Sequence, residues 1–428
     1  MYVDRFTKAK SLSANCYQYP KLRWPIEIRI ETFQNEEILL ISCPLGVSEK
    51  PLALVPAVAP ILQLFEGQLS IDEILAKFAP YGIQRELLNQ LVEMLDQNLY
   101  LATPRFFAAE KEIREKFTAA KVRPAALAGY GYSADPGELE RQIDKFLEVS
   151  KLDLNGQGQP LPPQNSYGAM QGLVSPHIDY HRGGICYGIT YANLRNQAHD
   201  LFVLIGTAHQ FSNHMFHLTP KDFSSPLGTL ECDLEMVTKI SQAYGLERSF
   251  ADEFLHRREH SLELQLPFLQ RLNPKAKIVP ILVGSFYQMV RADRKPNNYD
   301  EYESFVSALT AALKVRLEQG QKICFVAGVD MAHVGRAFGD EGGLNEDFML
   351  EIDRRDREYM IYISSADLTG LFSHIAQDQD RRRICGFPTM YTVIDCMTRL
   401  GLNYTAEIFD YRQAVNYSSD CTVTFAGM

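Results

Sequence analysis

The sequence has little that would place the chain in a membrane or cross-link it. Nowhere do about 18 consecutive apolar residues occur, the length that a helix needs to cross a bilayer. The N-terminus, MYVDRFTKAKSLSANCYQYP, lacks the charged and then apolar pattern of a secretory signal. The eight cysteines form no CxxC pair and have no regular spacing, which argues against a zinc ribbon and a disulfide framework. We therefore expect a cytoplasmic protein with reduced thiols and no membrane partner.

Positive charge is also in short supply. The chain has 43 Lys and Arg against 53 Asp and Glu, a formal net charge of −10, and its basic residues form no long run. Nucleic-acid binding depends on clustered Lys and Arg that displace counterions from phosphates. The charge balance therefore predicts that nucleic acid is not a partner.

The 428 residues, 46% of them hydrophobic, suffice for two or three domains. Residues 24–105 are predicted to form a small winged-helix α+β domain. Two β-rich runs, IEIRIETF and EEILLISC, precede three short helical patterns and a closing LYLATP strand. Ser70 and Glu73 fit the S-x-x-E capping box at the start of the second helix.

The function predicted for this first domain is docking of a peptide or protein. Residues 1–105 have 10 Lys and Arg against 12 Asp and Glu, a balance that repels phosphate. The segment resembles the coenzyme-PQQ synthesis protein D, and the resemblance implies a groove for precursor peptides. A dimerisation or packing domain is the alternative.

Residues 106–168 are predicted to be a helical connection and a loop. EKEIREKF and DPGELERQIDKFLEVS have helical patterns, and LNGQGQPLPPQNSYG, residues 154–168, is rich in loop-forming residues. From residue 169 to residue 428 strands and helices alternate, with strand candidates GLVSP, LFVLIG, KIVPILVG, KICFVAG and CTVTFAG. This alternation predicts one three-layer α/β domain.

Three predicted buried strands lead into residues that can bind a metal or transfer a proton. GLVSPH ends at His177, LFVLIGTAH ends at His209, and ICFVAGVDMAH contains Asp330 and His333. In a mainly parallel sheet the carboxyl ends of the strands open on one edge, so these residues are expected to meet. Two imidazoles from neighbouring strand ends would begin a divalent metal site.

The residues alone leave the third ligand open. Two histidines and a carboxylate would suit ferrous iron, whereas two histidines and a thiolate would also accept copper or zinc. Cys385 is preceded by three arginines, which are expected to lower the pKa of its thiol. The candidates for the third ligand are four carboxylates and this thiolate: Asp179, Asp233, Glu259, Asp330 and Cys385.

Two further pairs are candidate acid and base residues. In REHSLELQLPFLQ, Glu259 and His260 precede an apolar helical pattern, where the helix dipole stabilises a carboxylate and the histidine can shuttle protons. In GVDMAH, Asp330 and His333 are spaced so that a carboxylate could orient an imidazole or both could contact substrate.

Over residues 127–428 the chain resembles the MEMO family, known in prokaryotes as AmmeMemoRadiSam system protein B. Seven motifs occur in the family's order: AGYGYSADPGELERQIDKFL, SPHIDYHRGG, VLIGTAHQ, EHSLELQLPFLQ, VPILVG, GVDMAH and CGFP. The ordered series is more specific than any single motif. The resemblance implies that residues 127–150 belong to the same domain as residues 169–428. It also implies a fold similar to class III extradiol dioxygenases, with a nonhaem-iron type of pocket.

Carried over by motif, the resemblance implies a metal site made of His177, His209 and Cys385. Four catalytic residues would line the pocket: Glu259, His260, Asp330 and His333. The chain departs from the family in two places. PHAGY is here PHIDY, which adds Asp179 beside the metal histidine, and the usual Ser-Ser before the aspartate is Gly328-Val329. Asp179 and His181 are therefore candidates for a further ligand or a substrate contact.

These observations predict a metal-dependent oxidoreductase that uses Fe²⁺, with copper or zinc as alternatives. The expected substrate is a small molecule, such as an aromatic compound, or a peptide. His260 or His333 would act as the acid or base. The expected partner is a radical-SAM protein. Two alternatives stay open: a scaffold that binds metal or ligand without turnover, and a zinc-dependent hydrolase.

Overall fold

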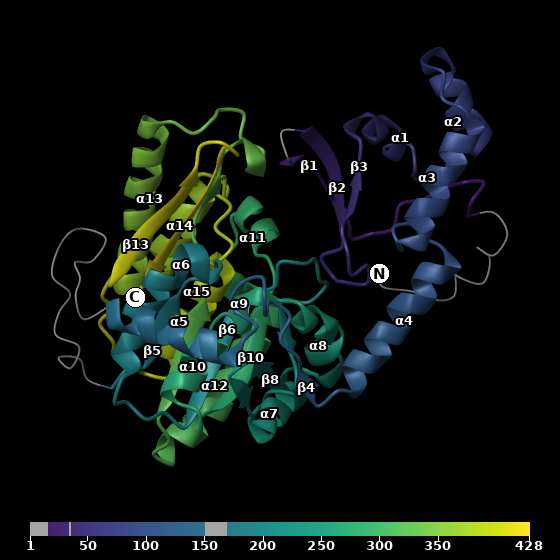
Figure 1. Ribbon diagram of the computed structural model, residues 1–428. Coiled ribbons are helices and arrows are strands. Elements are labelled where there is room, and N and C mark those ends of the chain that lie inside the picture. The colour runs from purple at the N-terminus through teal and green to yellow at the C-terminus, as the bar shows by residue number, and fades with distance from the viewer. Residues whose placement is uncertain (1–15, 34–35, 150–168) are drawn as a thin grey trace. The chain divides into compact units, whose positions relative to one another are not determined.

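The computed structural model describes residues 16–33, 36–149 and 169–428. The chain divides into two compact units, Met1–Ala119 and Ala120–Met428 (Figure 1). The loop predicted at residues 154–168 lies outside the described residues. Each unit has its own hydrophobic core.

The first unit has a three-stranded antiparallel sheet, β1 (Glu27–Phe33), β2 (Glu36–Ser42) and β3 (Leu52–Leu54). Its helices are α1 (Ala59–Leu62), α2 (Ile71–Phe78), α3 (Arg85–Gln97) and α4 (Pro104–Ala119). The closing strand predicted at LYLATP is wrong. Leu101 forms only an isolated bridge with Leu22, and α4 begins at Pro104. The winged-helix assignment stays a prediction.

The capping box predicted for the second helix is confirmed. Ser70 is the N-cap of α2, and its Oγ accepts a hydrogen bond from the Glu73 backbone N–H at 3.3 Å. The Glu73 carboxylate accepts in return from the Ser70 backbone N–H at 2.7 Å. Two backbone N–H groups of the first turn are thereby satisfied.

Ser70→Ala is expected to lower the free energy of unfolding of the first unit by about 1 kcal/mol, because the first turn of α2 loses its cap. The only tryptophan, Trp24, lies in this unit, so its fluorescence during urea unfolding reports the change. Ser42→Ala, at the end of β2, is the control and should change stability by less than about 0.5 kcal/mol. Equal losses in the two variants would contradict the role of the cap.

The second unit is built on a five-stranded sheet with the order β5, β11, β6, β10, β7. The strands are β5 (Gly172–Ser175), β11 (Ile323–Gly328), β6 (Leu201–Thr207), β10 (Lys277–Val283) and β7 (Phe216–Leu218). The first four are parallel and β7 is antiparallel to β10. They match four of the predicted strands, and the fifth, CTVTFAG, is in another sheet.

Alternate residues of the central strands face two separate cores. On β6, Val203 and Ile205 pack into one hydrophobic cluster, whereas Phe202 and Leu204 pack into the other. Because successive side chains of a strand point to opposite faces, the sheet must be covered on both sides. The unit therefore has three layers, and the predicted α/β class is confirmed.

One face of the sheet is covered by α7 (Leu234–Tyr244), α12 (Asp300–Glu318), α13 (Glu346–Ser364), α14 (Leu368–Gln377) and α15 (Phe387–Arg399). The other is covered by α5 (Pro136–Val149), α6 (Tyr180–Tyr191), α9 (His260–Glu263) and α10 (Leu266–Leu272). Two short helices, α8 (Leu246–Phe250) and α11 (Tyr287–Arg291), lie in the connections.

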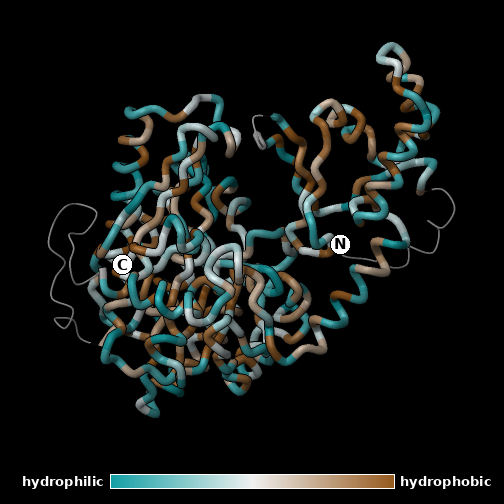
Figure 2. The backbone as a smooth tube through the Cα atoms, viewed as in Figure 1, coloured by the Kyte–Doolittle hydropathy of each residue, from teal (hydrophilic) through white to brown (hydrophobic). Residues whose placement is uncertain are grey.

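Two small sheets complete the second unit. One has the order β12 (His333–Val334), β14 (Cys421–Gly427), β13 (Asp410–Asn416), and the other β4 (Val122–Arg123), β8 (Asp222–Ser225), β9 (Gly228–Leu230). Figure 2 shows hydrophobic and hydrophilic stretches alternating along the chain in both units. Among the described residues, no helix combines the length and apolar character needed to cross a membrane.

Candidate metal centre

Three parallel strands of the central sheet end in register at one edge. Ser175 of β5 pairs with Gly328 of β11, which pairs with Gly206 of β6. Residues two or three positions beyond these pairs therefore leave the sheet side by side. They are His177, Asp330 and His209.

Cys385 joins this edge from just before the N-terminus of α15. Its Sγ is 3.3 Å from His177 Nε2, and its carbonyl accepts a hydrogen bond of 2.9 Å from Thr207 Oγ1 at the end of β6. His177, His209 and Cys385 each offer one ligand atom, and these atoms all lie within 4.8 Å of one another. A single divalent ion with nitrogen and sulfur ligands fits such a donor set.

The ring of His177 is held so that Nε2 faces Cys385. Its Nδ1 is 2.9 Å from the Gly328 carbonyl, and we assign the proton to Nδ1 because a carbonyl can only accept. Burial, with the neighbouring His209 and His260, holds the pKa of His177 well below its ordinary value. The ring is therefore neutral, which is the form that binds metals.

Glu259 orients two imidazoles at once. Its Oε1 is 3.0 Å from His209 Nδ1 and 3.2 Å from His260 Nδ1. Burial opposes its charged form, but His209 and His260 outweigh burial and hold the pKa of Glu259 well below its ordinary value. The charged carboxylate leaves the Nε2 atoms of both rings available on their other sides.

His209, Glu259 and His260 form a second group whose ligand atoms lie within 4.8 Å of one another. Its carboxylate, however, already accepts from two backbone N–H groups, Ser261 N to Oε1 at 3.0 Å and His209 N to Oε2 at 3.1 Å. Because these bonds and the two imidazoles occupy it, we interpret this group as support for the first.

His209 and Cys385 both hold a proton that must leave before they can bind a cation. Burial disfavours charge on His209, but Glu259 and Cys385 outweigh it and raise the pKa of His209 well above its ordinary value. Burial also raises the pKa of the Cys385 thiol, with His209 acting in the opposite direction. A bound cation would displace both protons.

The expectation that neighbouring arginines lower the pKa of Cys385 is therefore wrong. Arg382 pairs with Asp356 at 3.3 Å and with Asp378 at 3.0 Å, and Arg383 pairs with Asp340 at 2.7 Å. Carboxylates neutralise these two guanidinium groups, so burial decides the pKa of the thiol.

Asp330 lies beside the first group. One carboxylate oxygen accepts from the His177 backbone N–H at 2.9 Å, and the other is 3.7 Å from His177 Nε2. Burial raises the pKa of Asp330 to about 7. The carboxyl can therefore hold or release a proton near neutral pH.

His333 has partners other than Asp330. Its Nδ1 is 3.2 Å from the Met331 carbonyl, and its ring packs edge-on against Phe338 at 5.3 Å between centroids. Burial lowers the pKa of His333 to about 4. The structure thus orients this imidazole through a backbone carbonyl.

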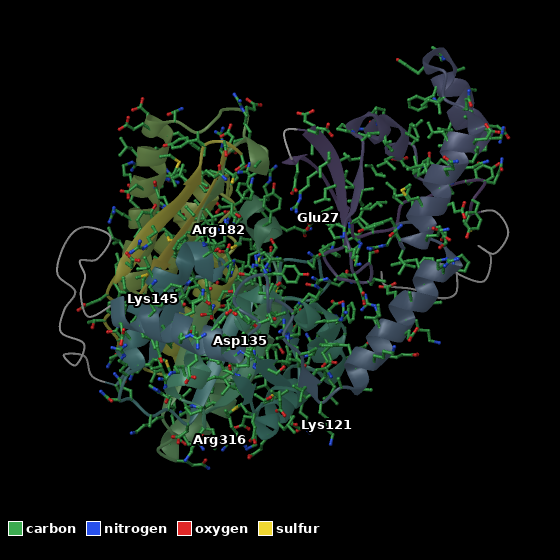
Figure 3. All side chains as sticks on the ribbon, in the orientation of Figure 1. Glu27, Lys121, Asp135, Lys145, Arg182 and Arg316 are labelled. Carbon is green, nitrogen blue, oxygen red and sulfur yellow. The ribbon has the colours of Figure 1, made fainter. Side chains whose placement is uncertain are left out.

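Asp179 and Asp233 cap helices and belong to neither ligand group. Asp179 begins α6, accepts from the Arg182 backbone N–H at 3.1 Å, and pairs with the Arg182 guanidinium at 2.6 Å (Figure 3 labels Arg182). His181 is exposed in the first turn of α6. Asp233 begins α7 and accepts from the Met236 backbone N–H at 3.0 Å.

Close packing at Gly206 and Gly328 was not foreseen from the sequence. A Cβ on Gly328 would lie 2.1 Å from the Ser261 carbonyl oxygen, and one on Gly206 would lie 2.4 Å from Ser261 Oγ. Glycine at the end of two neighbouring apolar runs was the available signal. It lets the Glu259–His260 stretch approach the strands directly.

Comparison with known proteins gives the same family along most of the chain. The Memo-like protein family model matches residues 123–428. A MEMO1 family protein of Aquifex aeolicus is 28% identical over 388 residues, which cover 90% of this chain and 94% of that protein. A MEMO1 family protein of Thermus thermophilus is 29% identical over 279 residues, 65% of this chain and 74% of that protein. One of Methanosarcina barkeri is 26% identical over 303 residues, 70% and 95% of the two chains. The chain belongs to the Memo-like protein family.

Proposed function

We propose that the second unit is a metal-dependent oxidoreductase and that His177, His209 and Cys385 hold its ion, ferrous iron. The observation that carries the proposal is the convergence of these three donor atoms within 4.8 Å at the ends of parallel strands. Three protein ligands leave coordination positions open. Iron so held would supply the electron transfer that protein side chains cannot.

His260 is the residue we propose as proton acceptor. Glu259 fixes its Nδ1, and its ring centroid lies 5.0 Å from that of His177 and 4.4 Å from that of His209. Burial lowers the pKa of His260 to about 4, so at neutral pH its Nε2 can accept a proton from a substrate group. Asp330 and His333 would then hold or contact the substrate.

We also propose that the substrate is a small molecule, such as an aromatic compound, or a peptide, and that the partner is a radical-SAM protein. These two proposals follow from the resemblance to the MEMO family. Docking of a peptide or protein by the first unit follows instead from the charge balance of residues 1–105 and from the resemblance to the coenzyme-PQQ synthesis protein D. Trp24 is the only tryptophan and is exposed in that unit, so docking of a peptide or partner should change its emission. If a complex with the peptide or partner is detected by another method and the emission of Trp24 is unchanged at saturation, the first unit is not the docking site.

The proposed function is tested on the full chain, purified anaerobically and loaded with Fe²⁺. We expect one iron per chain, and dioxygen uptake with at least one member of a panel of catechol-like and peptide substrates that stops on chelation. If the protein binds one iron per chain but takes up no dioxygen, its function is metal binding without catalysis. If the protein loaded with zinc hydrolyses a substrate at a rate that does not depend on dioxygen, it is a hydrolase and not an oxidoreductase.

A further inference from the structure

An ion pair with no exposed surface contacts the stretch of chain that carries Glu259. Arg123 of β4 and Glu263, the last residue of α9, are both 0% exposed and are in direct contact. Neither offers an atom to the ligand groups of the centre. Burying two charges is costly unless each is fully hydrogen-bonded, so their partners indicate what the pair holds in place.

The Arg123 guanidinium holds the chain on both sides of Glu259 and His260. Its Nε donates to the His256 carbonyl at 2.8 Å, and its Nη2 donates to the Glu259 carbonyl at 3.0 Å. Its Nη1 contacts Glu263 one turn further along. One planar cation thus spans the stretch that carries the Glu259 carboxylate.

The Glu263 carboxylate joins the same stretch to residues 126–132. Its Oε1 accepts from the Leu127 backbone N–H at 2.7 Å and from the Tyr132 hydroxyl at 2.6 Å. The Ala126 backbone N–H also donates to it at 2.9 Å. The carboxylate is saturated with donors and has no free position for substrate or metal.

The short helix α9, which follows Glu259, needs contacts with the rest of the unit to stay in place. α9 is four residues long, and a single turn is not stable in isolation. Its first turn is tied to β6 by a hydrogen bond of 3.0 Å from Ser261 Oγ to the Thr207 carbonyl, and its last residue is tied by Arg123. A shift of α9 would change the 3.0 and 3.2 Å distances between Glu259 and the two imidazoles.

We infer that Arg123 and Glu263 are positioning residues for the metal centre: through α9 they set the Glu259 carboxylate, and through it the rings of His209 and His260. The role in metal binding rests on the proposed function. The effect on the positions of the His209 and His260 rings does not, because it can be measured in metal-free protein. Arg123 is planar and donates in three directions, which a lysine ammonium at the same place cannot reproduce.

The test uses the full chain with Arg123→Lys, and Arg316→Lys as the matched control. Arg316 pairs with Asp233 and Glu235 at the start of α7, away from the ligand groups. The readouts are thermal unfolding, affinity for Co²⁺ with its absorption spectrum, and ring ¹⁵N shifts of His209 and His260 in metal-free protein. Arg123→Lys should weaken Co²⁺ binding roughly tenfold, the lower end for loss of a group that orients ligands, and move both ring shifts. Arg316→Lys should change neither.

Wild-type ring shifts together with wild-type Co²⁺ affinity in Arg123→Lys, whatever its thermal stability, would overturn the inference and leave the ion pair a purely structural role. If Arg123→Lys does not fold, Tyr132→Phe removes a single hydrogen bond to Glu263 and should move the same shifts by less; unmoved shifts in that variant would also overturn it. Wild-type protein that binds no Co²⁺ would defeat the proposed function, and the ring shifts would still decide the positioning role.

Discussion

A chain carrying both His177→Ala and His209→Ala is expected to lose stoichiometric iron binding. The two imidazoles are two of the three donors that lie within 4.8 Å of one another, and Cys385 alone would remain. Each ligand of a four-ligand zinc site accounts for roughly 3 kcal/mol of binding, so two losses should weaken affinity by about 10⁴-fold. Iron content after anaerobic loading and gel filtration measures the effect.

His199→Ala is the matched control for this variant. His199 is a buried histidine just before β6, at the opposite end of the strand from His209, and its Nε2 is 2.9 Å from the Met170 carbonyl. The control removes a buried imidazole without touching a proposed ligand and should retain one iron per chain. Iron retained by the double variant at the wild-type level would rule out these two ligands.

Gly328→Ala is expected to destabilise the second unit by about 3 kcal/mol, the upper end for overpacking. The added Cβ would lie 2.1 Å from the Ser261 carbonyl oxygen and 2.9 Å from Gln265 Nε2. The first of these is a backbone atom, so α9 or β11 must move. The Gly328 carbonyl also bonds His177 Nδ1 at 2.9 Å, so iron affinity should fall with stability.

Gly342→Ala provides the comparison for Gly328→Ala. Among the described residues, nothing lies within 4 Å of a Cβ placed there, and the variant should change stability by less than about 0.5 kcal/mol. Urea unfolding followed by far-UV circular dichroism, with iron content in parallel, measures both effects. Equal stability of the two glycine variants would show that the site can accommodate a Cβ at position 328 beside the Ser261 carbonyl oxygen.

The strand ends of the site could be predicted because their signal is local. Strands buried on both faces are continuous apolar runs, and parallel strands must end on one edge, so His177, His209 and Asp330 could be brought together from sequence alone. Cys385 could not. It arrives from the N-terminal side of a helix. The residues alone made Cys385 one of five candidates for the third ligand, and only the resemblance to MEMO proteins chose it among them; in the structure its Sγ lies 3.3 Å from His177 Nε2.

The supporting contacts had no comparable signal. Arg123 lies in a strand of two residues and meets Glu263 across 140 positions, a separation that no periodicity reveals. The effect of the arginines before Cys385 was predicted with the wrong sign, because adjacency in sequence does not show that Arg382 and Arg383 turn to other carboxylates. Such contacts depend on where loops fold back, which side-chain patterns leave undetermined.

The ligands of the iron can be identified by X-ray absorption spectroscopy at the iron edge, on wild-type protein loaded anaerobically. If His177, His209 and Cys385 hold the ion, the spectrum should show one sulfur scatterer at about 2.3 Å and at least two imidazole nitrogens at about 2.0–2.1 Å, by analogy with zinc sites of the same ligand types. The sulfur scatterer should disappear in Cys385→Ala. A wild-type spectrum with oxygen and nitrogen scatterers only would show that Cys385 does not bind the iron.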